Sequence, residues 1–259
     1  MGSATLAGPP GDCCFKAVRH EGEPRGSIEK IADVETYIAR PSRGESDKII
    51  LFFADVYGAL FVNSKLIMDY WADNGFLVLG LDYFERDSFA YHKDNPGWDR
   101  QGWIKQKRET AAVLLPPWIE AVRTQYGTDK KYTCVGYCFG APYVMEYIKT
   151  EWILAGAFAH PAFLNEDDFK GVKQPLLMSC AEVDHTFPVE SRRKAEDLLV
   201  EQKAKYYIQV FSSVEHGFAL RGDMSAPIQR WAKEESARGI LNWFNHFCDL
   251  SQRSGGTTL

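Results

Sequence analysis

Long apolar runs are missing from this sequence of 259 residues. No uninterrupted stretch of about 18 apolar residues occurs, which excludes an ordinary membrane-spanning helix. The first residues carry neither the basic region nor the apolar region of a secretory signal peptide. A basic excess is missing as well, since the formal net charge is −5, so nucleic acid has no electrostatic reason to bind. We therefore expect a cytoplasmic protein with neither nucleic-acid nor membrane partners.

Cysteine is scarce, and repeats and low-complexity tracts are absent. The six cysteines are Cys13, Cys14, Cys134, Cys138, Cys180 and Cys248. Two of them lie inside apolar strand-like runs, where a thiol packs as a small side chain, and this usage is typical of intracellular proteins rather than of a disulfide framework. A chain of this length buries about 70–75% of its unfolded surface, so it needs no disulfides to hold a core.

The composition indicates one domain with two less ordered ends. We expect residues 27–250 to form a single domain, because no linker interrupts them. Residues 1–26 are expected to form an N-terminal extension that is partly flexible, since the first twelve are small and rich in glycine and proline. Residues 251–259 have the same character and are expected to form a flexible tail.

Apolar runs of strand length alternate with helical periods along the domain. The expected strands are Ile49–Phe53, Phe76–Leu81, Lys131–Val135, Ile153–Ala159, Leu176–Ala181 and Tyr206–Phe211. The expected helices are Asn63–Asn74, Arg100–Tyr126, Ala141–Thr150, Val189–Gln202 and Ala226–Phe247. This alternation predicts an α/β fold, with a mostly parallel central sheet and helices on both faces. Ser27–Arg40 predicts an N-terminal hairpin at the edge of that sheet, turning around Ala32 and Asp33.

Two helices carry local signals of their own. Asn63 is expected to cap the first helix, and Gly75 to end it. Pro116 and Pro117 interrupt the hydrogen bonding of the long period Arg100–Tyr126, so we expect one kinked helix or two helices there.

The most informative stretch is Gly136-Tyr137-Cys138-Phe139-Gly140, a G-x-C-x-G pattern between an expected strand and an expected helix. This is the spacing and context of a nucleophile elbow, with sulfur in place of the usual oxygen. The flanking glycines let two pieces of backbone pass close together and push the middle residue to the top of the sheet. The alternative is that Cys138 is one more buried thiol in a glycine-rich turn.

A cysteine nucleophile needs a base and a carboxylate that orients the base, in the order nucleophile, acid, histidine on this type of fold. Asp184 follows the strand Leu176–Ala181, and His216 follows the strand Tyr206–Phe211. Both therefore lie at carboxyl ends of strands, where open α/β sheets bind ligands. Glu182 is a rival for the acid. His160 also ends a strand, but it precedes Asp184, so its expected role is pocket wall or packing.

Three motifs in this order resemble the dienelactone hydrolase family of the α/β-hydrolases. They are Gly136–Ala141, Glu182–His185 and His216–Ala219, and the resemblance runs from about Ile28 to Phe247. Two further segments, Cys13–Lys16 and His20–Gly22, resemble the N-terminal extension of fungal members.

The resemblance implies a triad of Cys138, His216 and Asp184 that hydrolyses small-molecule esters or enol-lactones without a cofactor or metal, in a monomer or homodimer. It also implies that Asp55, where the type enzyme has Glu, contacts the resting thiol of Cys138. The backbone N–H groups of Phe139 and Val56 would then form the oxyanion hole.

The substrate-gripping arginines of the type enzyme are matched only in part. Leu220 aligns with one of them, and Arg221 follows one residue later, so Arg221 is the candidate for substrate binding. Trp103 is a further candidate for the substrate pocket, because the stretch Phe84–Trp103 is rich in aromatic residues and can form an apolar wall. Tyr57, next to Val56, is another candidate.

Other functions fit the same residues. The triad also suits a thioesterase, or a cyclising or C–C-cleaving enzyme of secondary metabolism, and the fold suits a binding protein that has lost its activity. The sulfur favours activated acyl groups such as enol-lactones, because an alkoxide leaving group would expel the thiolate instead.

Overall fold

The computed structural model describes the chain apart from residues 1, 12–13, 15, 93 and 255–259. The strands are β1 Thr5–Ala7, β2 Ser27–Ile31, β3 Val34–Ala39, β4 Lys48–Phe53, β5 Leu77–Leu81, β6 Lys131–Tyr137, β7 Ile153–Ala159, β8 Leu164–Asn165, β9 Leu176–Val183 and β10 Tyr206–Glu215. The helices are α1 Val62–Asp73, α2 Arg100–Tyr126, α3 Ala141–Tyr147, α4 Glu166–Phe169, α5 Val189–Glu201, α6 Phe218–Arg221 and α7 Pro227–Ser254, with short 3₁₀ turns η2 Phe89–Tyr91 and η3 Cys138–Gly140.

The central sheet has eight strands in the order β10-β9-β7-β6-β4-β5-β3-β2. The strands from β10 to β5 are parallel, and β3 runs antiparallel to both β5 and β2. The hairpin β2–β3 turns at Ala32 and Asp33, whose φ angles of 49° and 62° suit the tight turn. The predicted mostly parallel sheet with a hairpin at its edge is confirmed.

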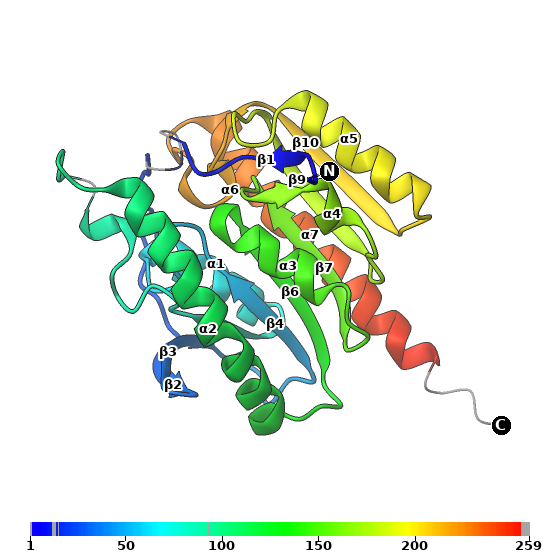
Figure 1. Ribbon diagram of the computed structural model, residues 1–259. Helices are drawn as coiled ribbons and strands as arrows, with labels where there is room; N and C mark the ends of the chain where they lie inside the picture. Colours follow the sequence, from blue (N-terminus) through cyan, green and yellow to red (C-terminus); the bar gives the residue numbers. More distant parts are fainter. Residues whose placement is uncertain (1, 12–13, 15, 93, 255–259) are drawn as a thin grey trace.

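Helices cover both faces of the sheet, as predicted (Figure 1). On one face α1 and α7 are joined by a hydrogen bond from the Trp71 indole to the carbonyl of Ala237. The opposite face carries α2 and α3. Strands β4 and β6 are apolar and buried because they are covered on both sides, which explains their continuous hydrophobic sequences. Among the described residues, no helix is both long and apolar enough to cross a membrane.

One prediction about the helices needs correction. Helix α1 begins at Val62, and Asn63 makes no cap, because its side chain instead binds the backbone of Val18, His20 and Leu220. Of the two alternatives for Arg100–Tyr126, the structure shows a single helix, α2.

The two prolines of α2 are tolerated because they lie on its exposed side. Pro116 and Pro117 free the carbonyls of Ala112 and Val113, and both of these residues are exposed, so water can satisfy those carbonyls.

The first residues of the chain have a structural role that the sequence did not predict. Strand β1 pairs with β8 in a separate two-stranded sheet, with Thr5 opposite Asn165. The chain then continues past the edge where the parallel strands end, and Gly8 donates a hydrogen bond to the carbonyl of Thr186. We call Ala4–Gly11, Cys14 and Lys16–Gly22 the N-terminal segment. The predicted flexible tail lies mostly outside the described residues.

Candidate active site

Cys138 occupies a sharp, strained turn at the end of β6. Its φ of 47° is unusual for a residue with a side chain, as expected at a nucleophile elbow. A Cβ on Gly140 would lie 2.2 Å from the carbonyl oxygen of Phe53, and one on Gly136 would lie 2.5 Å from that of Gly140. Both flanking glycines are therefore required by close backbone contacts.

His216 and Asp184 lie together at the ends of β10 and β9. The imidazole Nδ1 is 2.9 Å and 3.0 Å from the two carboxylate oxygens of Asp184. Thr186 supports the pair, because its hydroxyl lies 2.6 Å from Asp184 Oδ1 and 2.8 Å from His216 Nδ1. Backbone N–H groups of Thr186 and Phe187 also donate to the carboxylate, which holds it in place.

The pair is buried, and its charges stabilise each other. Burial alone lowers the pKa of His216, but the Asp184 carboxylate and the Cys14 sulfur outweigh this effect and raise that pKa to about 10. Burial alone raises the pKa of Asp184, but the charge of His216 and the hydrogen bonds hold that pKa below its usual 3.8. The geometry therefore favours an imidazolium and a carboxylate around neutral pH.

The two rivals for these positions are placed elsewhere. Glu182 is exposed and accepts a hydrogen bond from the backbone of Ser213. His160 is fully buried, with its ring centroid 4.9 Å from that of His216. Burial, together with the charges of His216 and Arg221, holds the pKa of His160 well below its usual value, so this ring packs against His216 as a neutral group.

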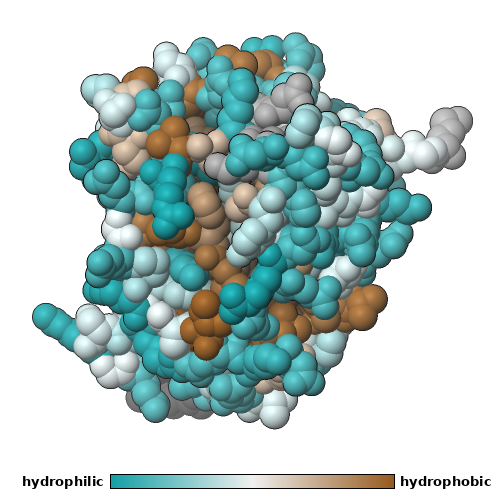
Figure 2. Space-filling model, turned by 90° about the vertical axis from the view of Figure 1, so that its left-hand side faces the viewer, coloured by the Kyte–Doolittle hydropathy of each residue, from teal (hydrophilic) through white to brown (hydrophobic). Residues whose placement is uncertain are grey.

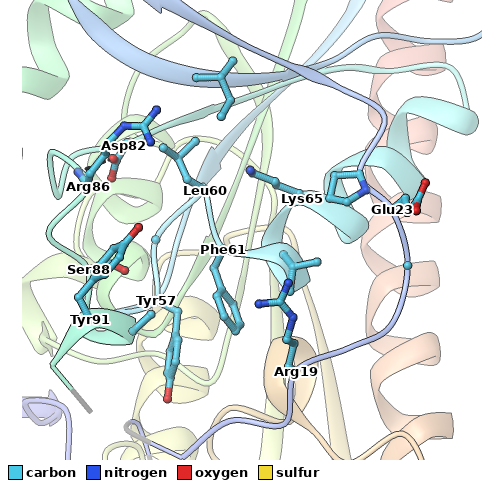
Figure 3. Close-up of a pocket in the computed structure, with 16 residues that line it drawn as sticks. Arg19, Glu23, Tyr57, Leu60, Phe61, Lys65, Asp82, Arg86, Ser88 and Tyr91 are labelled. Atoms are coloured by element: carbon cyan, nitrogen blue, oxygen red, sulfur yellow. Dashed lines mark hydrogen bonds between the residues drawn. The ribbon is translucent and has the colours of Figure 1, made fainter. Parts of the chain in front are cut away.

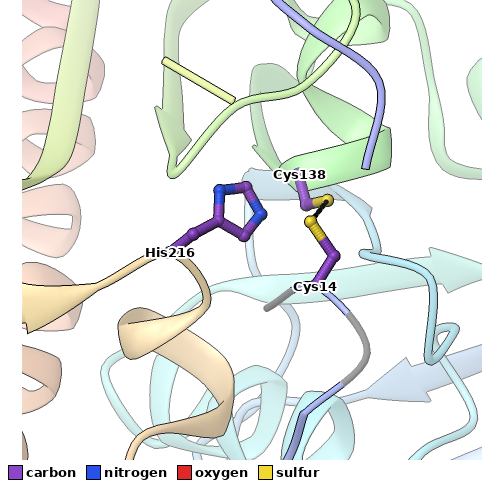
Figure 4. Close-up of side chains that lie close together, drawn as sticks. All are labelled: Cys14, Cys138 and His216. Atoms are coloured by element: carbon purple, nitrogen blue, oxygen red, sulfur yellow. Dashed lines mark hydrogen bonds between the residues drawn. The ribbon is translucent and has the colours of Figure 1, made fainter. Parts of the chain in front are cut away.

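The structure brings a second cysteine to the elbow, which the sequence argument did not place there. Cys14 Sγ lies 3.8 Å from Cys138 Sγ, and both residues are fully buried (Figure 4). One ligand atom from each of Cys14, Cys138 and His216 lies within 4.8 Å of the others. The sequence draws attention to Cys14 only through the Cys13–Lys16 motif of the N-terminal extension. No local pattern shows where that extension lies relative to the sheet.

Asp55 forms a buried ion pair with Arg221. Its Oδ2 lies 2.6 Å from Arg221 Nε, and its Oδ1 accepts a hydrogen bond of 2.9 Å from the backbone N–H of Tyr57. The partner of Asp55 among the described residues is thus Arg221, where we had expected the thiol of Cys138. The side chain of Asp55 is one methylene shorter than the Glu of the type enzyme. Asp55 also begins a turn, in which the N–H of Gly58 donates a hydrogen bond to the Asp55 carbonyl.

Arg221 is buried and holds the N-terminal segment against the site. Its Nη1 donates hydrogen bonds to the carbonyls of Cys14 and Lys16, the latter at 2.7 Å. Its guanidinium lies over the ring of Tyr57 at 5.3 Å and interacts electrostatically with the thiols of Cys14 and Cys138. The guanidinium that we had expected to grip substrate is thus occupied by groups of the protein itself.

The two candidate oxyanion donors lie at one edge of the sheet. Strands β4 and β6 are paired up to Phe53 and Gly136. Val56 and Phe139 each follow three residues later, and both are buried. Adjacent parallel strands end at the same edge, so both residues lie at the edge of the sheet that carries Cys138.

Of the expected pocket residues, Tyr57 lines a cavity, whereas Trp103 is almost fully buried. Tyr57, Leu60 and Phe61 line a pocket of about 530 Å³, with Arg19 and Tyr91 at its border (Figure 3). Trp103 is instead packed inside the protein.

Packing holds Trp103 in the protein interior. It is 5% exposed, and its indole N–H donates to the carbonyl of Asp87. Its ring packs against the rings of Phe84 and Trp98, so these residues of the aromatic stretch pack against one another inside the protein.

A second pocket, of about 360 Å³, lies next to His216, whose side chain is itself buried. It is lined by His216 and Arg221 on one side and by Lys16, Ala17 and Val18 of the N-terminal segment on the other. The surface has a hollow in which apolar residues gather between hydrophilic borders (Figure 2).

Comparison with known proteins places this geometry in context. A sequence model described as "Dienelactone hydrolase family" matches residues 34–248. "Dienlactone hydrolase 1" of Gibberella moniliformis is 36% identical over 248 residues, which cover 93% of this chain and 95% of that protein. "Hydrolase pyvD" of Aspergillus violaceofuscus is 35% identical over 246 residues, covering 92% and 97%.

A solved structure supports the fold. The dienelactone hydrolase from Anabaena variabilis superposes with a TM-score of 0.56 at 13% identity, covering 88% of this chain and 99% of that chain. This likeness concerns the fold alone, and it agrees with the α/β-hydrolase architecture expected from the sequence.

Proposed function

The chain belongs to the dienelactone hydrolase family of hydrolases, and on this premise we propose that it hydrolyses carboxylic esters or enol-lactones with Cys138 as its nucleophile. The observation that carries the proposal is the buried group at the elbow, where Nδ1 of His216 contacts Asp184 and a ring nitrogen of His216 lies within 4.8 Å of the Cys138 sulfur. A nucleophile, a base and an orienting carboxylate in one buried group are what acyl transfer requires.

The first step is attack of the Cys138 thiolate on the acyl carbonyl. The N–H groups of Phe139 and Val56 are the proposed donors to the oxyanion, a contribution worth about 10² to 10³ in rate for one donor. When the tetrahedral intermediate collapses, the carbon–oxygen bond to the leaving group breaks, and His216 passes its proton to that oxygen. Water then attacks the thioester with His216 as base, which releases the acid and restores the thiol.

Two charged groups, Asp184 and Arg221, set the electrostatics of the site before substrate binds. Asp184 raises the pKa of His216, so the imidazole can hold the proton of the thiol. The Arg221 guanidinium, held by Asp55, adds a positive charge near Cys138. In this proposal Asp55 acts as a positioning residue, through Arg221.

The substrate class follows from sulfur chemistry. A thiolate is a better leaving group than an alkoxide, so attack on a plain alkyl ester reverts, whereas an enolate or phenolate leaves readily. We therefore expect enol-lactones and aryl esters to be hydrolysed faster than alkyl esters. The fungal relatives named as dienelactone hydrolase and hydrolase agree with this class.

The test compares wild type with Cys138→Ala, His216→Gln and the control Cys248→Ala, using an aryl ester and an enol-lactone. Both site variants should lose at least about 10³ in kcat/KM, because members of a triad act as a unit. The control removes a buried thiol of α7 and should keep its rate. Wild-type turnover in both site variants would overturn the triad.

A second measurement separates hydrolysis from cyclisation. In ¹⁸O-labelled water, hydrolysis places the label in the carboxylic acid product, whereas cyclisation leaves the product unlabelled. Mass spectrometry of the protein during turnover should also detect an acyl group on Cys138.

A further inference from the structure

Three soft donor atoms meet at the elbow, and hydrolysis needs only two of them. Cys138 and His216 have roles in the proposed reaction, but the thiol of Cys14 has none. It nevertheless lies fully buried at 3.8 Å from Cys138 Sγ, and both sulfurs face the imidazole of His216 (Figure 4). The cluster therefore calls for a function beyond acyl transfer.

The spacing of the donors fits a tetrahedral ion. Zinc binds thiolate at about 2.3 Å and imidazole at about 2.0–2.1 Å, so two sulfurs on one tetrahedral ion lie about 3.8 Å apart. The observed separation of Cys14 Sγ and Cys138 Sγ is 3.8 Å, and all three donor atoms lie within 4.8 Å of one another. The two sulfurs already have the separation that a shared ion requires, and a small change of side-chain conformation brings the ring nitrogen of His216 to bonding distance from that ion.

The surroundings of His216 orient it as metal-binding histidines are oriented. A histidine ligand usually donates its second ring N–H to a carboxylate, which fixes the tautomer and leaves the other nitrogen for the ion. Here Asp184 and Thr186 lie against Nδ1, so Nε2 is the atom available to an ion. The same contacts that suit a general base thus suit a metal ligand.

The third ligand is held in place by the fold. Arg221 binds the carbonyl of Cys14, and the Cys14 N–H donates to the carbonyl of Gly11 at 2.9 Å. A pocket of about 360 Å³ lined by His216 and Lys16 lies beside the cluster.

With an ion bound, the ion and the two thiolates cancel, and one net negative charge remains on Asp184 beside the neutral imidazole of His216. Asp55 offsets the charge of Arg221, so that pair as a whole adds no net charge to the cluster. Two thiolates neutralise a divalent cation, and their softness selects zinc-like ions over magnesium or calcium.

We infer that Cys14, Cys138 and His216 form a binding site for Zn²⁺ or an ion of similar softness, which occupies the nucleophile and stops turnover. Three protein ligands leave a fourth position for water. No electron transfer is involved: the Cys14 thiol and the His216 imidazolium, which holds the proton of Cys138, each lose one proton to solvent, and the ion binds two thiolates and the neutral imidazole. The inhibition rests on the proposed function, whereas the binding does not.

Cobalt is the probe for binding, because Co²⁺ occupies the same sites and absorbs light. The reduced full-length protein is titrated with Co²⁺ under a phosphine reductant. We expect thiolate-to-cobalt absorption in the near ultraviolet, with the strong visible bands of a tetrahedral site, and bleaching of both when Zn²⁺ displaces the cobalt. The absence of these bands in wild type would overturn the site.

Variants identify the ligands. Cys14→Ser should weaken Zn²⁺ binding by at least about 100-fold, since the loss of a supporting hydrogen bond already costs 10- to 100-fold. His216→Gln, a second variant on another element, should weaken binding to a similar extent. The control Cys248→Ala should bind Zn²⁺ as wild type does. Binding within about twofold of wild type in Cys14→Ser would overturn the proposal.

Activity is measured separately. Zn²⁺ should suppress ester hydrolysis by wild type, and a chelator should restore it. Inhibition of each variant is expressed relative to its own metal-free rate, and Cys14→Ser should resist Zn²⁺ at concentrations that stop wild type. A protein that binds cobalt but hydrolyses no ester would contradict the proposed function and leave the metal site standing.

Discussion

Asp55 and Arg221 show how much depends on single residues of this protein. Both side chains are 1% exposed, and they are joined at 2.6 Å. Two charges taken out of water attract strongly, but each has lost its hydration, so the pair stabilises the fold only while both members are present.

The costs of removing the two members should therefore not be additive. Arg221→Gln leaves the Asp55 carboxylate buried without its counter-charge, and we expect a loss of about 3–5 kcal/mol in the free energy of unfolding. Asp55→Asn should cost a similar amount, and the double variant less than the sum. Urea unfolding measures all three; a double variant whose loss equals the sum would show that the two groups are not coupled.

The residues of the site could be predicted from the sequence where each one comes directly after a recognisable strand. Cys138, Asp184 and His216 each come directly after a strand, and the structure places them together. The partner of Asp55 was not predictable, because an ion pair between distant segments leaves no local pattern. Cys14 drew attention only through its motif, since nothing in the sequence shows which edge of the sheet it reaches.

At the scale of elements, the elbow depends on the close approach of β4, β6 and the turn η3. Gly136→Ala would place a methyl group 2.5 Å from the Gly140 carbonyl oxygen, a backbone atom that cannot rotate away. We expect a loss of about 1–3 kcal/mol in unfolding free energy and a larger loss of kcat, because the Cys138 turn must shift. Gly97→Ala is the control, since its nearest contact would be 3.8 Å away. Equal stability of the two variants would contradict the close-packing argument.

The strands were predictable because burial on both faces gives continuous apolar runs. Their ends were not: β9 and β10 continue to Val183 and Glu215, which pair with each other beyond the apolar runs. The last residues of β9 and β10, which are exposed or polar, place Asp184 and His216 next to each other. Strand β1 was missed because three residues paired with a distant two-residue strand give no periodic signal.

The N-terminal segment responds to acid through His20. Its Nε2 lies 2.9 Å from the carbonyl of Gly222, and burial, opposed only in part by that hydrogen bond, lowers its pKa below 6.5. A histidine with a lowered pKa in the folded state stabilises the fold above pH 6.5, and that stability is lost as the pH falls below it.

Replacement of His20 should remove this dependence on pH. We expect wild type to lose unfolding free energy between pH 7 and pH 5 more steeply than His20→Gln, which cannot take up the proton. Urea unfolding at several pH values measures the two slopes. Parallel slopes would mean that the proton is bound equally well in the folded protein.

At the scale of the whole molecule, the N-terminal segment covers the site that the sheet builds. Cys138 is fully buried, so substrate reaches it only when this cover moves. Asn63 is a principal attachment, because its side chain bonds to the carbonyls of Val18 and Leu220 and to the N–H of His20, each at 2.9 Å.

Loss of Asn63 should make opening easier. Asn63→Ala removes three hydrogen bonds, each worth about 1 kcal/mol, so we expect alkylation of Cys138 by iodoacetamide to accelerate roughly tenfold or more. Peptide mass spectrometry follows the labelling, with buried Cys134 as the internal reference. A similar acceleration at Cys134 would indicate general destabilisation rather than local opening.

The pairing of β1 with β8 also sets an order of events when the chain is made. The residues synthesised first bind partners that leave the ribosome much later: Thr5 pairs with Asn165, Gly8 binds Thr186, and Cys14 waits for Arg221. The cover can therefore close only after nearly the whole chain has been translated. Until then Cys14 and Cys138 remain open to the reductants and metal ions of the cell, so the nascent protein passes through a stage in which its most reactive atoms are its least protected.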